Sequence, residues 1–158
     1  MKSLWRKNGA YIISVSAALA VGVLSAIFAG GKMEEYAALR QPPLAPPGWL
    51  FPVVWTALYI LMGISAARVW KTGSAERGDT LFLYGTQLIV NLLWTIFFFG
   101  FGARLLAFFW LLFLLLLVAV MTARFRQLDA PAAKMQIPYV VWLVFAAYLN
   151  FGVYLLNR

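Results

Sequence analysis

Long apolar segments separated by short polar ones run along the whole chain. Five of them have the length, about 20 residues, that an α-helix needs to cross the hydrocarbon core of a bilayer. They cover residues 10–29, 49–70, 80–100, 105–123 and 137–156. The pattern predicts an all-α integral membrane protein with a single domain, residues 1–158. This domain is a five-transmembrane-helix bundle with a long proline-rich loop, residues 30–48, between the first two helices.

The composition agrees with this class. Hydrophobic residues make up 64% of the chain and charged residues 11%, whereas about one quarter of the residues in a soluble domain are charged. Lys2, Arg6 and Lys7 precede the first apolar segment, as they would in a signal peptide. That segment is longer than the roughly 7 to 15 apolar residues of a signal peptide, so we interpret it as a span.

The basic residues predict the orientation in the membrane. The net charge is +8, but these residues are scattered in short loops and form no concentrated basic face, so no nucleic-acid partner is expected. The positive-inside rule places the N-terminus in the cytoplasm and the C-terminus outside, in an expected bacterial cell membrane. Nine basic residues lie on one predicted side and four on the other: Lys2, Arg6, Lys7, Arg68, Lys71, Arg77, Arg124, Arg126 and Lys134 against Lys32, Arg40, Arg104 and Arg158.

The chain contains neither cysteine nor histidine. This excludes zinc chemistry, nucleophiles activated by histidine, and the usual ligation of haem iron by histidine or cysteine. We therefore expect no metal site, no catalytic residue and no required cofactor.

Two spans show simple patterns. On the first, Ala18, Gly22, Ala26 and Gly30 form a stripe of small residues at a spacing of four, which allows another helix to approach closely. This stripe fits packing within the chain, a dimer face or a pocket wall. The fourth span shows no clear face and is predicted to meet lipid over much of its surface.

The other three spans carry aromatic and amide residues at helical spacing. Amides at membrane depth are costly without partners, so they should face the bundle interior or a cavity. Helix packing is one explanation, and a pocket for a flat, mostly apolar ligand is the other. The stripes are Trp55, Tyr59, Met62 and Gly63 on the second span, Gln87, Asn91 and Trp94 on the third, and Pro138, Trp142, Ala146 and Asn150 on the fifth.

Three motifs in order resemble one known family over essentially the whole chain. They are "PPLAPPGWLFPVVWTALYILMG", "NLLWTIFFFG" and "PYVVWLVFAAYLNF". The chain is similar to the translocator proteins, also called tryptophan-rich sensory proteins or peripheral-type benzodiazepine receptor homologues.

The resemblance implies a five-helix bundle, commonly a homodimer, with a cavity beneath the loop between the first two spans. Family members bind porphyrins such as protoporphyrin IX and haem, and synthetic isoquinoline and benzodiazepine ligands; some bind sterols. By position, the pocket would contain Trp55, Asn91 and Trp142, with Ala146 and Ala147 where the fifth helix passes the ligand. With the stripe residues Tyr59, Trp94 and Asn150, these are the candidate ligand-binding residues.

Two positions depart from the family pattern. Leu44 stands where the family often has a tryptophan in the loop, so lid contacts from this position are not expected. Ile96 stands where some bacterial members have proline, which should leave the third helix straighter.

The prolines of residues 41–55 predict a stiff lid. Each proline restricts its own φ and disfavours helix at the preceding residue, so "PPLAPP" should be an extended strap. Pro46, Pro47 and Trp49 would then cover the pocket, while Pro52 occupies the first turn of the second span. The alternative is a rigid loop that only sets helix spacing.

A weak sterol-binding pattern is formed by Leu149, Tyr154 and Arg158. Tyrosine and arginine at a helix end are also ordinary interface anchors, so both interpretations stay open.

The leading functional hypothesis is a membrane protein that senses, sequesters or helps to move tetrapyrroles, with porphyrin as ligand and membrane lipid, or a sterol, as a further partner. Lys32 and Arg40 are candidate partners of porphyrin carboxylates. One alternative is light- and oxygen-dependent porphyrin breakdown, although no general acid or base is visible. The other is a secondary transporter, against which the lack of intramembrane charge and of an inverted repeat argues.

Overall fold

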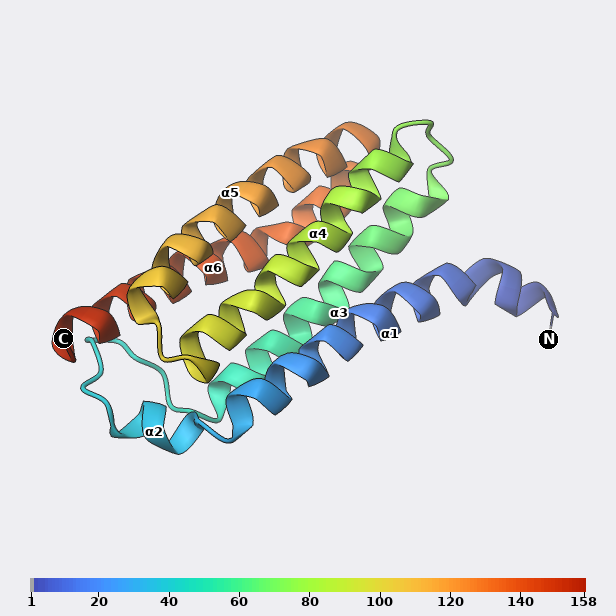
Figure 1. The fold of residues 1–158 in the computed structure, drawn as a ribbon. Coiled ribbons are helices and arrows are strands. Elements are labelled where there is room, and N and C mark those ends of the chain that lie inside the picture. The colour runs from blue at the N-terminus through green and yellow to red at the C-terminus, as the bar shows by residue number, and fades with distance from the viewer. Residues whose placement is uncertain (1) are drawn as a thin grey trace.

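The computed structural model describes residues 2–158, with side chains from Asn8 onward. Five of its helices are long and apolar enough to cross a membrane, which confirms the predicted class. The elements are α1 (Lys2–Gly30), α2 (Met33–Ala38), α3 (Leu50–Lys71), α4 (Arg77–Thr95) with a π-helical turn (Ile96–Gly100), α5 (Arg104–Leu128) and α6 (Ala130–Leu156). The two ends of the chain lie at opposite ends of the bundle (Figure 1).

Helix α1 packs along α3, and its first turns diverge from the bundle (Figure 1). Two glycines allow the close approach. A Cβ on Gly63 would lie 2.5 Å from the Cα of Val15, and one on Gly22 would lie 2.7 Å from the Tyr59 ring. Ala18, one turn before Gly22, is fully buried. Ala18 and Gly22, the first two residues of the small-residue stripe, therefore serve helix packing within the chain.

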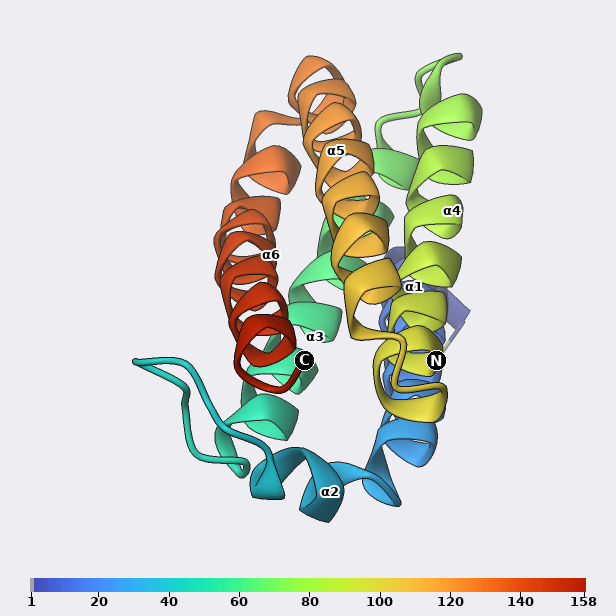
Figure 2. The ribbon, with the colours of Figure 1, turned by 60° about the vertical axis from the view of Figure 1, so that its left-hand side comes forward.

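The prediction that the fourth span has no clear face is wrong. Helix α5 lies between α4 and α6 (Figure 2) and contacts both. Its fully buried residues follow alternating spacings of four and three, as in coiled-coil packing, and its phenylalanines and leucines on the other side are exposed. Since nearly every residue of the span is apolar, hydropathy alone does not separate these two sides. The buried face is Ala107, Leu111, Leu114, Val118, Met121 and Phe125.

The helices α5 and α6 are longer than the apolar segments that predicted them, and a single residue, Asp129, separates them. Its carboxylate accepts a hydrogen bond of 2.7 Å from the Ala132 backbone N–H and so caps α6. It also forms a double hydrogen bond with Arg68 of α3, at 3.0 Å from Nε and 3.0 Å from Nη2. This end of the bundle is thus held by a charged pair that links α3 to the α5–α6 corner.

The third span does not continue to its end as a regular α-helix, a feature that was not predicted from the sequence. Its last turn, Ile96–Gly100, has π-helical geometry. An inserted π turn changes the direction of the side chains that follow it. Here it directs Phe98 and Phe99 into the cavity described below.

Candidate ligand-binding cavity

One cavity of about 810 Å³ lies at the α2 end of the bundle. Residues of α1, α3, α4, the π turn and α6 form its walls, and α2 with the following loop forms its cover. The volume lies within the range of about 300 to 1,000 Å³ that is usual for small-molecule sites. Ala26 and Gly30, the second half of the stripe on α1, belong to this wall.

Trp55 is the centre of the aromatic wall. Its ring centroid lies 5.7 Å from that of Tyr59, 6.4 Å from Trp94, 6.5 Å from Trp142 and 6.2 Å from Tyr139. Trp55 comes from α3, Trp94 from α4 and Trp142 from α6, so three helices build one surface. Flat, polarisable walls of this kind suit an aromatic ligand, which gains stacking energy beyond the burial of apolar area.

The buried amides of α4 and α6 join the helices. Asn91 Nδ2 donates to the Tyr139 hydroxyl at 3.1 Å, and that hydroxyl donates to Gln87 Oε1 at 2.8 Å. Asn150 Oδ1 accepts from Trp94 Nε1 at 3.1 Å, while its Nδ2 donates to the Arg104 carbonyl at 2.8 Å. Amides with partners of this kind act as interhelical bonds. The packing explanation is therefore confirmed for Asn91 and Asn150, and both residues also line the cavity.

The predicted ligand-binding residues come together with one exception. Ala147 is buried but lies outside the cavity wall. Its neighbour Ala146 lies in the wall, since successive helical residues point about 100° apart. The predicted residues in the wall are Trp55, Tyr59, Asn91, Trp94, Trp142, Ala146 and Asn150.

The cover differs from the predicted lid. Pro46 lines the cavity, but Pro47 and Trp49 do not, and Trp49 is 67% exposed. The short helix α2 takes their place. Its Tyr36 ring packs against Phe51 of α3 and against Phe98 and Phe99, with centroids 5.7 to 6.1 Å apart. Burial raises the pKa of Tyr36, so its hydroxyl stays protonated and adds no charge.

Helix α2 was not predicted from the sequence, and neither were Met33, Tyr36 and Ala37 in the cover or Gln41 after it. The stretch MEEYAA, six residues long, is too short for a periodic signal. Good helix formers and two glutamates in its first turn were the available indications.

The strap is not fully extended. Ala45 N–H donates to the Pro42 carbonyl at 3.2 Å, and Leu44 has a φ of 67°. This is a turn with proline second and a left-handed residue third, where glycine is usual. Leu44 points its side chain outward, 84% exposed. The stretch resists helix formation as expected, but it bends at Leu44.

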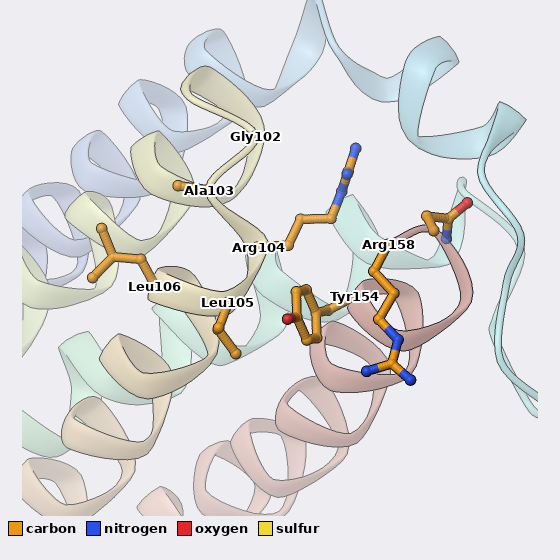
Figure 3. A pocket seen from close by; sticks show the side chains of 8 residues that line it. Gly102, Ala103, Arg104, Leu105, Leu106, Tyr154 and Arg158 are labelled. Atoms are coloured by element: carbon orange, nitrogen blue, oxygen red, sulfur yellow. The ribbon is translucent and has the colours of Figure 1, made fainter.

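The residues of the sterol pattern do not share one surface. Leu149 lines the main cavity, whereas Tyr154 and Arg158 line a separate open groove of about 360 Å³ beside Arg104 and Leu105. Leu149 and Tyr154 are five positions apart, so they lie on different sides of a helix with about 3.6 residues per turn. Figure 3 shows the side chains of Arg104 and Arg158 pointing away from each other around Tyr154.

The predicted carboxylate partners lie outside the cavity wall. Lys32 Nζ is bound to Glu35 Oε1 at 2.8 Å, and the exposed Arg40 does not line the cavity. Among the described residues that line the cavity, Glu34 in the cover is the one with a charged side chain.

Comparison with known proteins agrees with this architecture. The sequence model of the TspO/MBR family matches residues 14–156. The chain belongs to the TspO/MBR family.

Its relatives come from distant organisms. The tryptophan-rich protein TspO of Chlorobaculum tepidum is 36% identical over 89% of this chain and 94% of the relative. The protein CrtK of Rhodobacter capsulatus is 41% identical over 86% of this chain and 85% of the relative. The translocator protein of Ovis aries is 38% identical over 82% of this chain and 78% of the relative. Membership of the family thus rests on similarity across all five spans.

Proposed function

We propose that this protein binds flat tetrapyrroles, such as protoporphyrin IX or haem, in the cavity under α2, and that it serves to sense, sequester or move them. The observation that carries the proposal is the cavity of about 810 Å³ with tryptophans from three helices in its wall. Relatives named as a tryptophan-rich sensory protein and as a translocator protein support a role in sensing or transfer.

The wall accounts for affinity without a metal bond. Trp55, Trp94 and Trp142 offer ring faces and edges, and the remaining wall is mostly aliphatic or small. Because the chain has no histidine or cysteine, haem would be held through its ring and not through the usual axial ligands. Metal-free protoporphyrin should then bind about as well as haem.

The proposal includes the setting of the protein. The distribution of basic residues supports a cell membrane with the N-terminus in the cytoplasm, and the family resemblance supports a homodimer.

Titration in lipid nanodiscs tests the function. The purified protein is titrated with protoporphyrin IX in the dark, and binding is followed by the shift of porphyrin absorbance. We expect saturation near one porphyrin per chain. Trp55→Ala and Trp142→Ala should each weaken binding about tenfold to a hundredfold, since each removes stacking and buried area worth about 1 to 3 kcal/mol.

Trp70 provides the matched control. It lies on α3 like Trp55, is 51% exposed, and stacks with Arg77 at 4.4 Å near the other end of the helix. Trp70→Ala should leave porphyrin affinity unchanged. Thermal unfolding of each unliganded variant is measured alongside. Equal affinity in folded Trp55→Ala, Trp142→Ala and Trp70→Ala proteins would contradict the proposed site.

A further inference from the structure

The open groove of about 360 Å³ between the start of α5 and the end of α6 carries two cations. Arg104 is the first residue of α5, and Arg158 follows the end of α6. Their side chains point away from each other around Tyr154 (Figure 3). A charged group seated over the Tyr154 ring therefore lies in the field of both guanidinium groups.

Neither of these arginines has a counter-ion in the described part of the chain. The whole sequence has five acidic residues, and none of them is among the described residues that line the groove. The ion pairs of the described residues join Lys32 to Glu35 and Arg68 to Asp129. Two guanidinium groups at one groove repel each other, so a negatively charged partner from outside the chain would stabilise this arrangement.

The groove lies at the height where a bilayer has its phosphate groups. The membrane-spanning helix α5 begins at Arg104, and α6 ends at Leu156, two residues before Arg158. The ends of spanning helices mark the boundary between the hydrocarbon core and the headgroup layer. Basic side chains at this boundary meet the charged groups of lipids.

The floor of the groove is apolar and continues toward the hydrocarbon core. The Tyr154 ring stacks on that of Phe151 with centroids 6.3 Å apart, and Phe151 packs against Phe108 of α5 at 4.8 Å. Leu105 and Leu106 line the groove and are exposed. This surface suits acyl chains, whereas a soluble anion would use the two cations alone.

We propose that the groove binds one anionic phospholipid, with its phosphate at Arg104 and Arg158 and its acyl chains along Leu105, Leu106 and Tyr154. Arginine suits this partner because its planar guanidinium forms paired hydrogen bonds with phosphate oxygens. An ammonium group on the same headgroup would be repelled by the two arginines. The groove shares no described lining residue with the cavity under α2, so the inference is independent of the proposed function.

Native mass spectrometry in a neutral detergent tests the site, because it counts the lipids bound to each protein. The probes are dioctanoyl phosphatidylglycerol, dioctanoyl phosphatidylcholine and glycerol 3-phosphate, each titrated against the same protein. We expect the first phosphatidylglycerol to bind at least about fivefold more tightly than phosphatidylcholine. Glycerol 3-phosphate, which has a phosphate but no acyl chain, should bind much more weakly than phosphatidylglycerol.

Arg104→Gln and Arg158→Gln should each weaken the binding of phosphatidylglycerol about three- to tenfold, with phosphatidylcholine almost unchanged. The double variant should lose the preference between the two lipids. Replacement of both arginines by lysine keeps the charge but loses the paired hydrogen bonds, so it should give an intermediate affinity. The unfolding temperature of each lipid-free variant is measured alongside, and the single variants decide the result if the double variant does not fold.

The double variant Arg124→Gln, Arg126→Gln is the matched control. It removes two exposed arginines near the other end of α5, so it should retain the preference for phosphatidylglycerol. Equal losses in the two double variants would mean that the preference follows net charge, which overturns the site. Equal affinity of the wild type for the two lipids, or for phosphatidylglycerol and glycerol 3-phosphate, overturns it as well.

Discussion

The side chain of Asn157 forms two hydrogen bonds with the backbone of Arg40, 117 positions earlier in the chain. Arg40 N–H donates to Asn157 Oδ1 at 3.0 Å, and Asn157 Nδ2 donates to the Arg40 carbonyl at 2.9 Å. Nearby, the Tyr148 hydroxyl donates to the Pro43 carbonyl at 2.7 Å. Arg40 and Pro43 are thus attached to the C-terminal end of α6. This end of α6 therefore positions the loop that follows α2.

Asn157→Ala should loosen this attachment. It removes both hydrogen bonds to Arg40, so we expect a loss of about 1 kcal/mol in the free energy of unfolding. Hydrogen exchange at the amides of Arg40, Gln41 and Leu44 should become faster. Asn157→Asp, which keeps the acceptor for Arg40 N–H but loses the donor, should show an intermediate effect. Unchanged exchange in both variants would mean that the strap is held by packing alone.

Gly152→Ala should displace the strap by steric contact. A Cβ at Gly152 would lie 2.7 Å from Pro42 Cβ and 2.9 Å from Pro42 Cγ. A proline ring has little freedom to move away, so we expect a lower unfolding temperature and a cost of about 1 to 3 kcal/mol. Gly85→Ala in α4 is the control, because a Cβ there meets no described atom within 4 Å. That variant should be neutral, or more stable by up to about 1 kcal/mol.

Tyr139→Phe should separate structural from ligand-binding roles in the amide network. The hydroxyl of Tyr139 joins Asn91 and Gln87, but Tyr139 lies outside the cavity wall. Its removal leaves two buried amides without this partner, for a cost of about 1 to 3 kcal/mol in stability. Porphyrin affinity measured below the unfolding temperature should change little.

Asn91→Ala should reduce both stability and affinity, since Asn91 lies in the network and in the wall. Tyr154→Phe, in the separate groove, serves as control for both measurements. If Tyr139→Phe weakened porphyrin binding as much as Asn91→Ala, the assignment of the wall would be wrong.

Asp129 should make stability depend on acid pH. Burial raises the pKa of Asp129, but the hydrogen bonds from Arg68 and from the Ala132 N–H, with the charge of Arg68, outweigh it and lower the pKa below its ordinary value. The stabilisation is therefore complete above about pH 4 and is lost as the pH falls through the folded-state pKa. Asp129→Asn, which can still cap α6, should lose about 1 to 2 kcal/mol near neutral pH, and Asp129→Ala should lose more.

Thermal unfolding in detergent between pH 6 and pH 3 measures this dependence. Asp129→Asn should remove the part of the acid sensitivity that belongs to this pair, whereas Asp79→Asn, in the first turn of α4, should retain it. Identical pH profiles for wild type and Asp129→Asn would show that the ion pair with Arg68 does not contribute.

The hydropathy pattern by itself determined the five spans, because length and apolar content are properties of each segment alone. Helical spacing also placed Trp55 and Tyr59, or Trp142 and Ala146, on common faces, since the period of the α-helix is constant. These faces proved to meet at one cavity. A polar residue in an apolar helix was the informative signal, because its cost in lipid requires an interior position.

Only the tertiary structure decided what each face meets. The buried face of α5 has no polar contrast with its lipid face, so hydropathy could not identify Leu111 or Val118 as interior. The contacts of the loop depend on residues distant in sequence, such as Arg40 with Asn157 and Tyr36 with Phe98. Loops have no periodic pattern of side chains. Glu34 lines the cavity and Lys32 does not, which follows from how α2 lies across the helix ends. Local pattern specifies the helices, whereas the lining of the cavity depends on side chains brought together by packing.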